Sequence, residues 1–229
     1  MSVAEKMTAI ANAIRNKTGK TDKLSLDEMA TEINEISSGE RDINPEWTNW
    51  SYFCQYRDSL AAKLKYGDTS NGTNFTSMFG NCESLTSAPA LDTSKGTNFG
   101  SMFNYCKLLT SAPALDTSNG TNFGYMFRGC KELTSIPALD TSNGTNFSNM
   151  FYGCDALVDL NVVGTINATG LNVSYSKLLS HDSLMSIINA LANKTGVSGT
   201  WKVTLGATNL AKLTADEIAI AEGKGWTLA

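Results

Sequence analysis

The chain has few of the residues on which catalysis, metal binding and nucleic-acid binding most often depend. Its 229 residues include one histidine, and the formal net charge is only -4. Because no basic stripe is present, neither nucleic acid nor an anionic membrane surface is expected as a partner. No apolar run approaches the roughly 18 residues of a membrane-spanning helix. Residues 1–20 lack the apolar stretch of a secretory signal, so none is expected there.

Motifs for common enzyme chemistry are also missing. The sequence contains no glycine-rich phosphate loop and no Gly-x-Ser-x-Gly nucleophile elbow. The single histidine, His181, lies between Ser180 and Asp182 at the start of a predicted helix, where such residues usually act as caps. We therefore expect a protein that is not an enzyme and that needs neither a cofactor nor a metal.

What the chain does contain is one phrase written four times at a period of 24 residues. The copies open at Asp68, Asp92, Asp116 and Asp140. A unit of this length cannot bury its apolar positions alone, so the copies must stack and share a core. The sequence therefore predicts an α/β fold, a leucine-rich-repeat solenoid over residues 68–163. We expect the aspartates to cap turns, since no further carboxylates follow them to complete a calcium site.

Each repeat divides into two parts. Phe75, Met78, Phe79 and Cys82 have the spacing of one inward-facing helical or 3₁₀ turn. The residues before Pro89 are expected to be extended, because proline disfavours helix in the residue that precedes it. Stacked copies of this extended segment predict a parallel β ladder.

The cysteines recur with the repeats, one in each. Metal sites favour cysteines two to four residues apart, and disulfides along such a ladder would be strained. We expect buried free thiols. The four are Cys82, Cys106, Cys130 and Cys154.

The ends of the chain differ from the repeats. Residues 1–38 contain two expected short helices, 2–17 and 25–37, which serve attachment or oligomerisation, either as a three-fold bundle or by local docking. Residues 39–67 are interpreted as a linker and a degenerate capping repeat. Residues 164–229 are expected to form a strand–helix cap. Its expected strands are 171–175, 201–205 and 226–228, and its expected helices are 180–193 and 214–222.

The repeated phrase Phe-x-x-Met-Phe-x-x-Cys-x-x-Leu-Thr-Ser-x-Pro-x-Leu-Asp-Thr-Ser resembles the short bacterial surface-protein class of leucine-rich repeats, the BspA-like group. The asparagine ladder that follows the strand in long leucine-rich repeats is not reproduced. Residues 10–33 and 205–228 are similar to segments of tail-fibre and baseplate proteins from phages and prophages of Gram-positive hosts. The resemblance implies host attachment, often through a trimer anchored by its N-terminal part.

Comparison of the four copies separates fixed positions from variable ones. The variable positions form a candidate ligand-binding ridge, suited to a glycan because tyrosine and asparagine can stack on and hydrogen-bond a sugar. The alternative is neutral drift on a solvated face. The ridge residues are Asn104, Tyr105, Lys107, Tyr125, Arg128, Lys131, Asn149 and Tyr152. A second candidate is the polar row Thr86, Ser87, Thr110, Ser111, Thr134 and Ser135.

The expected function is host attachment by a phage or prophage tail protein located in the virion tail. Its expected partners are a host cell-surface glycan or protein and, through the N-terminal helices, a tail or baseplate protein. A homotrimer is one option for its assembly. The alternatives are a bacterial cell-surface adhesin and an intracellular protein-interaction module.

Overall fold

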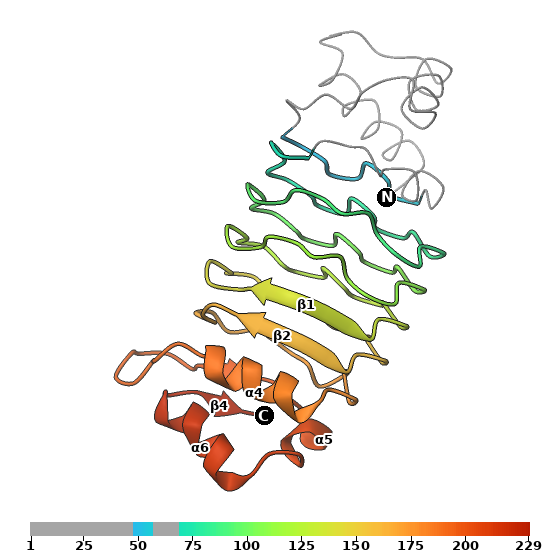
Figure 1. Cartoon of the computed structure of the whole chain (residues 1–229). Helices are drawn as coiled ribbons and strands as arrows, with labels where there is room; N and C mark the ends of the chain where they lie inside the picture. The colour runs from blue at the N-terminus through green and yellow to red at the C-terminus, as the bar shows by residue number, and fades with distance from the viewer. Residues whose placement is uncertain (1–47, 57–68) are drawn as a thin grey trace, which may run out of the picture.

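The computed structural model describes residues 48–56 and 69–229 (Figure 1). The expected helices at 2–17 and 25–37, and most of the segment 39–67, lie outside the described residues. The described chain has a mixed α/β fold. Its elements are β1 (Ser135–Asp140), β2 (Asp159–Val163), α4 (His181–Ala190), β3 (Lys202–Val203), α5 (Ala207–Leu210), α6 (Ala215–Gly223) and β4 (Thr227–Leu228).

The repeats lie one beside the next in a single stack (Figure 1). On one side, β1 and β2 pair in parallel, with a register irregularity between Ile136 and Ala138. Single parallel bridges continue this side through Ser87, Ser111 and Ser135. The predicted parallel pairing is therefore confirmed. We call this side of the stack the strand side.

The other side, which we call the turn side, differs from the prediction. The segment from Phe75 to Cys82 forms consecutive turns, such as the one closed by the hydrogen bond from the Met78 N–H to the Phe75 oxygen (3.1 Å). Every second backbone N–H in this segment instead donates to an oxygen of the next repeat, as the Phe75 N–H does to the Asn98 oxygen (2.8 Å). The prediction of a helical turn was wrong, because half of these N–H groups hold neighbouring repeats together.

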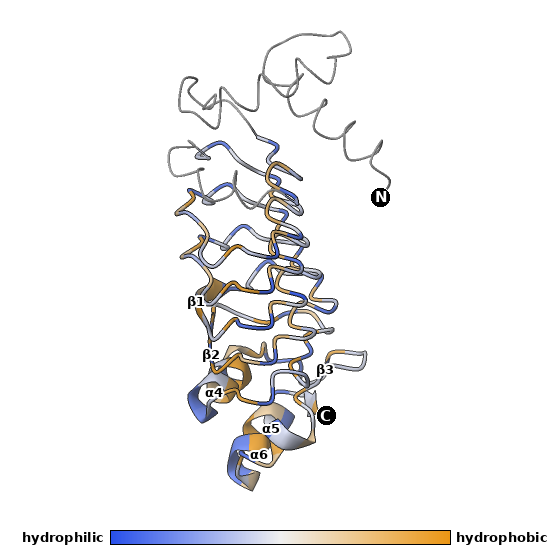
Figure 2. Cartoon of the chain, turned by 90° about the vertical axis from the view of Figure 1, so that its right-hand side faces the viewer, coloured by the Kyte–Doolittle hydropathy of each residue, from blue (hydrophilic) through white to orange (hydrophobic). Residues whose placement is uncertain are grey.

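The core consists of two columns of phenylalanine rings. Neighbouring rings in each column are stacked, with centroids 5.2 to 6.2 Å apart and planes within 3° to 8° of parallel. All eight rings are at most 1% exposed, so their predicted inward direction is confirmed. The turned view in Figure 2 shows hydrophobic and hydrophilic stretches recurring at matching places along the stack.

Asparagine side chains of successive repeats are joined by hydrogen bonds, which we call the asparagine ladder. The Asn122 Nδ2 donates to the Asn98 Oδ1 (3.0 Å), and the Asn146 Nδ2 donates to the Asn122 Oδ1 (2.9 Å). Each Oδ1 also accepts a backbone N–H two residues later, as Asn122 does from Gly124 (3.1 Å). The ladder therefore links repeats and fixes the turn inside each one.

The short described segment 48–56 pairs with the first repeat through its backbone. Asn49 bridges in parallel to Asn74, and the fully buried Trp50 follows it where the repeats have phenylalanine. Residues 48–56 therefore continue the stack on its N-terminal side.

The C-terminal segment covers the other end of the stack. Serines of α4 satisfy the free edge of β2: the Leu160 N–H donates to the Ser183 Oγ (2.8 Å), and the Ser186 Oγ donates to the Leu160 oxygen (3.0 Å). Such cover keeps an open strand edge from pairing with another chain.

The two longer helices begin at capping residues, as expected at the start of α4. Ser180 caps α4, and Thr214 with Glu217 forms a capping box at α6. The last strands, β3 and β4, pair in parallel. The expected strand at 171–175 is reduced to one bridge, from Asn172 to Thr204.

Candidate functional site: the tyrosine–arginine patch

Three positions on the turn side vary strongly between repeats. They are the third, sixth and seventh residues after the ladder asparagine. The third and seventh have a positive φ, 60° at Tyr125 and 58° at Tyr105. The turn sets this sign of φ, since Ser77 and Asn81, at the same two positions of the first repeat, also have a positive φ. The fold therefore holds these two tyrosines in a conformation that bulky residues rarely adopt.

One arginine joins the tyrosines of three successive repeats. The guanidinium carbon of Arg128 lies 5.0 Å from the ring centroid of Tyr105, 5.7 Å from that of Tyr125 and 5.5 Å from that of Tyr152. All three distances are within the range of a cation–π contact. The ring of Tyr152 also packs on Tyr175, with centroids 4.3 Å apart. We call these five residues the tyrosine–arginine patch.

The patch presents an unusual amount of aromatic surface to solvent. Tyr125 is 40% exposed, Tyr152 41% and Tyr175 44%. Within residues 48–56 and 69–229, none of the four tyrosine hydroxyls makes a hydrogen bond, and Arg128 makes no ion pair. The hydroxyls and the guanidinium N–H groups are thus available to a ligand.

A glycine makes room for the patch. Gly129 has a φ of 73°, and a Cβ built on it would lie 2.7 Å from the Tyr105 ring. A side chain at this position would displace that ring from Arg128. The equivalent Gly153 has a φ of 74°, but its nearest neighbour would be 3.6 Å away.

The structure brings together four of the eight predicted ridge residues. The other four stand apart from the Arg128 contacts. Lys107 pairs with Glu83 (2.7 Å), Lys131 and Asn149 are exposed, and Asn104 is half-buried. The ridge is therefore narrower than the variable positions indicated.

Tyr175 is the patch residue that the sequence reasoning missed, because the repeat register is lost before it. A signal was present. Tyr175 follows Asn172 by three residues, as Tyr125 follows Asn122, and the Asn172 Oδ1 accepts the Ser174 N–H (3.0 Å) as in the true repeats. This local motif outlasts the full repeat.

In the second candidate, the polar row on the strand side, two threonine hydroxyls hold neighbouring repeats together. The Thr134 Oγ1 donates to the Thr110 oxygen (2.9 Å), and the Thr110 Oγ1 donates to the Thr86 oxygen (3.3 Å). These threonine hydroxyls hold successive repeats together, which leaves them fewer donors for a ligand.

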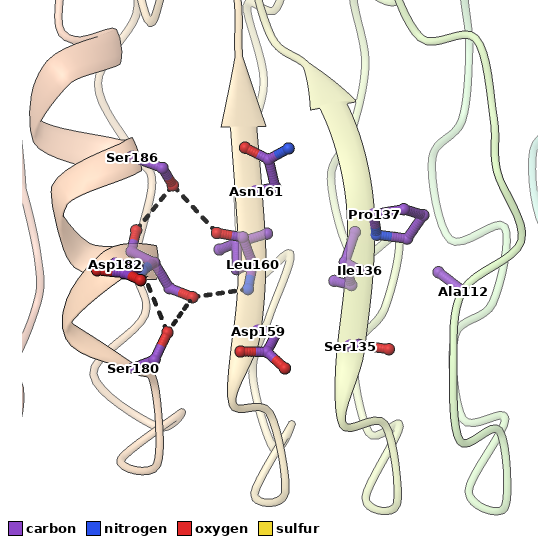
Figure 3. A pocket seen from close by; sticks show the side chains of 11 residues that line it. Ala112, Ser135, Ile136, Pro137, Asp159, Leu160, Asn161, Ser180, Asp182 and Ser186 are labelled. Atoms are coloured by element: carbon purple, nitrogen blue, oxygen red, sulfur yellow. Dashed lines mark hydrogen bonds between the residues drawn. The ribbon is translucent and has the colours of Figure 1, made fainter.

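An open pocket of about 560 Å³ lies on the strand side where α4 meets β2 (Figure 3). Asp159 and Asp182 line it, and three of its four serines make side-chain hydrogen bonds: the Ser183 Oγ contacts the Ser180 Oγ (2.8 Å) and receives the Leu160 N–H, and the Ser186 Oγ donates to the Leu160 oxygen. His181 is not among the lining residues. The pocket contains no nucleophile paired with a base.

His181 instead links two helices. Its Nε2 lies 2.8 Å from the Glu217 Oε1, and its side chain is about half exposed. Bonds from Thr214, with His181 as a smaller contribution, lower the pKa of Glu217. The expectation that this histidine sits at a capped helix start is confirmed, since α4 begins with it.

The cysteines form a buried column of free thiols, as expected. The Sγ atoms of Cys106, Cys130 and Cys154 each donate to a backbone oxygen of the preceding repeat, as Cys106 does to the Phe79 oxygen (3.1 Å). Burial raises the pKa of Cys154 to about 12 and that of Cys130 well above its usual value. Thiols in this state are poor nucleophiles.

The described residues contain no group of three or more potential metal-ligating side chains. They also contain no helix that is both long and apolar enough to cross a bilayer.

Comparison with known proteins gave one family match. The model described as "Mycoplasma protein of unknown function, DUF285" matches residues 25–113 and 73–176, so that together the two matches span the repeats. No curated protein and no solved structure matches the chain.

Proposed function

Since the chain belongs to the DUF285 family, whose function is unknown, we propose a function from the geometry: it is a non-enzymatic binding protein that contacts a host surface through the tyrosine–arginine patch. The stacked repeats are the scaffold, and the patch is the contact surface.

We assign the scaffold to the leucine-rich type of solenoid, of the BspA-like kind. The parallel bridges at every repeat and the continuous phenylalanine columns support this assignment. In such an architecture each repeat contacts only its neighbours, so outward residues can change without loss of the core. That property suits a protein whose surface must match a partner.

The observation that carries the proposal is the position of Arg128 between three tyrosine rings. Tyrosine and arginine are the residue types that most often dominate binding energy at interfaces. Here the fold fixes them before any partner arrives, so less conformational entropy is lost on binding. Drift on a solvated face gives no reason for an arginine to meet the tyrosines of three repeats.

The setting that we propose is a phage or prophage tail, with the chain as receptor-binding protein. This part rests on the similarity of residues 10–33 and 205–228 to tail-fibre and baseplate proteins. The N-terminal helices would attach the chain to the tail, and a trimer is the assembly that the resemblance implies. A solution mass of 24.5 kDa, that of one chain, would exclude the trimer.

Two other settings share the same binding surface. A bacterial cell-surface adhesin is favoured by the repeat resemblance, and an intracellular interaction module is favoured by the free thiols. The neighbouring genes separate the three, since tail and lysis genes would flank a phage protein.

Substitutions borrowed from other repeats test the proposal with little risk to the fold. Tyr105→Gly, Tyr125→Ser and Tyr152→Asn place at each position a residue that another repeat has there. The residues copied are, in the same order, Gly129, Ser101 and Asn104.

The assay is binding of the purified, labelled chain to host cells. The triple variant is expected to lose binding, while the control Ser87→Ala with Ser111→Ala on the strand side retains it. Equal binding by the triple variant and the original chain would refute the patch as the contact surface.

A further inference from the structure

We propose that the occupant of the patch is an anionic glycan chain, whose carboxylate or phosphate group pairs with Arg128 while its sugar rings pack on the tyrosines. This inference rests on the proposed function and specifies the ligand class.

The way in which the Arg128 guanidinium is held favours an anionic ligand. Three rings contact it at 5.0 to 5.7 Å, and these contacts orient it without using its N–H groups. An arginine presents five N–H donors in a planar fork that matches a carboxylate or a phosphate. No acidic side chain in the described residues pairs with it. The N–H donors of Arg128 can therefore pair with an anionic group of a ligand.

The positive charge of Arg128 selects for an anion over a neutral or a cationic ligand. A ligand that covers Arg128 removes water from a cation that is already half-buried. A neutral ligand would leave that cation without a partner, which is costly, and a cationic ligand would be repelled. An anion restores the lost interactions.

The shape of the patch favours a chain of sugars. Tyr105, Tyr125, Tyr152 and Tyr175 come from consecutive levels of the stack, with Arg128 among them. At about 4.8 Å per level, four levels span on the order of 15 Å. A row of three exposed rings and one half-buried ring, with unbonded hydroxyls, matches an extended chain of sugars better than a single small ion.

An acidic peptide is the competing occupant. Protein partners generally anchor large side chains in well-packed pockets. The pocket of about 560 Å³ described above is on the strand side, and none of the five patch residues lines it. The patch instead offers exposed tyrosine rings on which sugar rings can pack, which favours the glycan.

The test measures binding of the full chain to four polymers by titration calorimetry. The probes are a polyuronic acid, a poly(glycerol phosphate), neutral dextran and poly-glutamate. The first two distinguish a carboxylate from a phosphate as the source of the anion. The third and fourth represent the neutral glycan and the acidic peptide.

The variants are Arg128→Asn, Arg128→Lys and the control Lys95→Asn. Asn104 occupies the position of Arg128 in the preceding repeat, and Asn71 and Asn119 occupy that of Lys95. The two asparagine variants therefore lose the same charge at positions where the fold already accepts asparagine. Thermal unfolding checks that all three remain folded.

We expect one of the two anionic glycans to bind, and its affinity to fall about tenfold or more in Arg128→Asn. Arg128→Lys should also bind more weakly, because lysine keeps the charge but loses the fork. Lys95→Asn should bind like the original chain. Dextran or poly-glutamate as the preferred probe, no binding of either anionic glycan, or equal losses in both asparagine variants would overturn the inference.

The two proposals can fail separately. If the triple tyrosine variant loses binding to host cells while Arg128→Asn keeps it, the binding surface stands and the anionic ligand is wrong. If the triple variant also keeps cell binding, both proposals are wrong.

Discussion

Removal of one rung of the asparagine ladder tests how the repeats are held together. The Asn122 side chain takes part in three hydrogen bonds: with Asn98, with Asn146 and with the buried N–H of Gly124. At about 1 kcal/mol for each bond, Asn122→Ala should lower the free energy of unfolding by about 3 kcal/mol. With a urea m-value of about 3 kcal/mol/M, the midpoint should fall by about 1 M.

Asn119→Ala is the matched control in the same repeat. The Asn119 side chain is exposed and makes one hydrogen bond, from its Nδ2 to the Ser94 oxygen (2.8 Å). Loss of this bond should lower the free energy of unfolding by less than about 1 kcal/mol, which lowers the urea midpoint by less than about 0.3 M. Equilibrium unfolding in urea, followed by circular dichroism, compares the two variants. Equal midpoints would refute the ladder as a source of stability.

Three further outcomes are expected. A thiol assay should find five free thiols in denatured, unreduced protein and almost none in native protein. Because burial raises the pKa of Cys130 and Cys154, the free energy of unfolding should be constant below about pH 8.5. It should decline above that pH, as thiols of the unfolded chain ionise. A flat profile above that pH would contradict this. Thr214→Ala should cost about 1 kcal/mol in urea unfolding by removing the cap of α6, and no loss would contradict the capping box. Gly129→Ala should weaken cell binding more than Gly153→Ala, because only the first crowds a patch ring, and equal effects would count against that contact.

The architecture was largely predictable because it depends on repetition. A period of 24 residues fixes which positions face the core, and parallel pairing follows from stacking of identical units. Helix caps were predictable for a local reason. Ser180 and Thr214 act on backbone N–H groups within three residues, so their signal lies in the sequence itself.

The conformation of the turn side was not predictable from spacing. The interval between Phe75, Met78 and Phe79 is that of a helical turn, yet the backbone N–H groups alternate between their own repeat and the next. Periodicity reports which side chains are buried and does not report where hydrogen bonds go. The asparagine ladder was missed for the same reason, since it is a contact between repeats.

The candidate site was predictable only as a set of variable positions. Which of these meet depends on how neighbouring repeats align in space. Arg128 contacts Tyr105, which belongs to the preceding repeat, and Tyr152, which belongs to the next one. Lys107 instead forms an ion pair with Glu83. A comparison of repeats in sequence has no access to such contacts.

The central claim is that a partner covers the tyrosine–arginine patch, and tyrosine nitration of the chain on host cells tests it directly. Tyr56 is 50% exposed and outside the patch, so it serves as an internal control. Mass spectrometry would follow the nitration of each tyrosine in the free and the cell-bound chain. We predict that binding protects Tyr125, Tyr152 and Tyr175 and leaves Tyr56 reactive. Equal nitration of the patch tyrosines in the free and bound chain would contradict the claim.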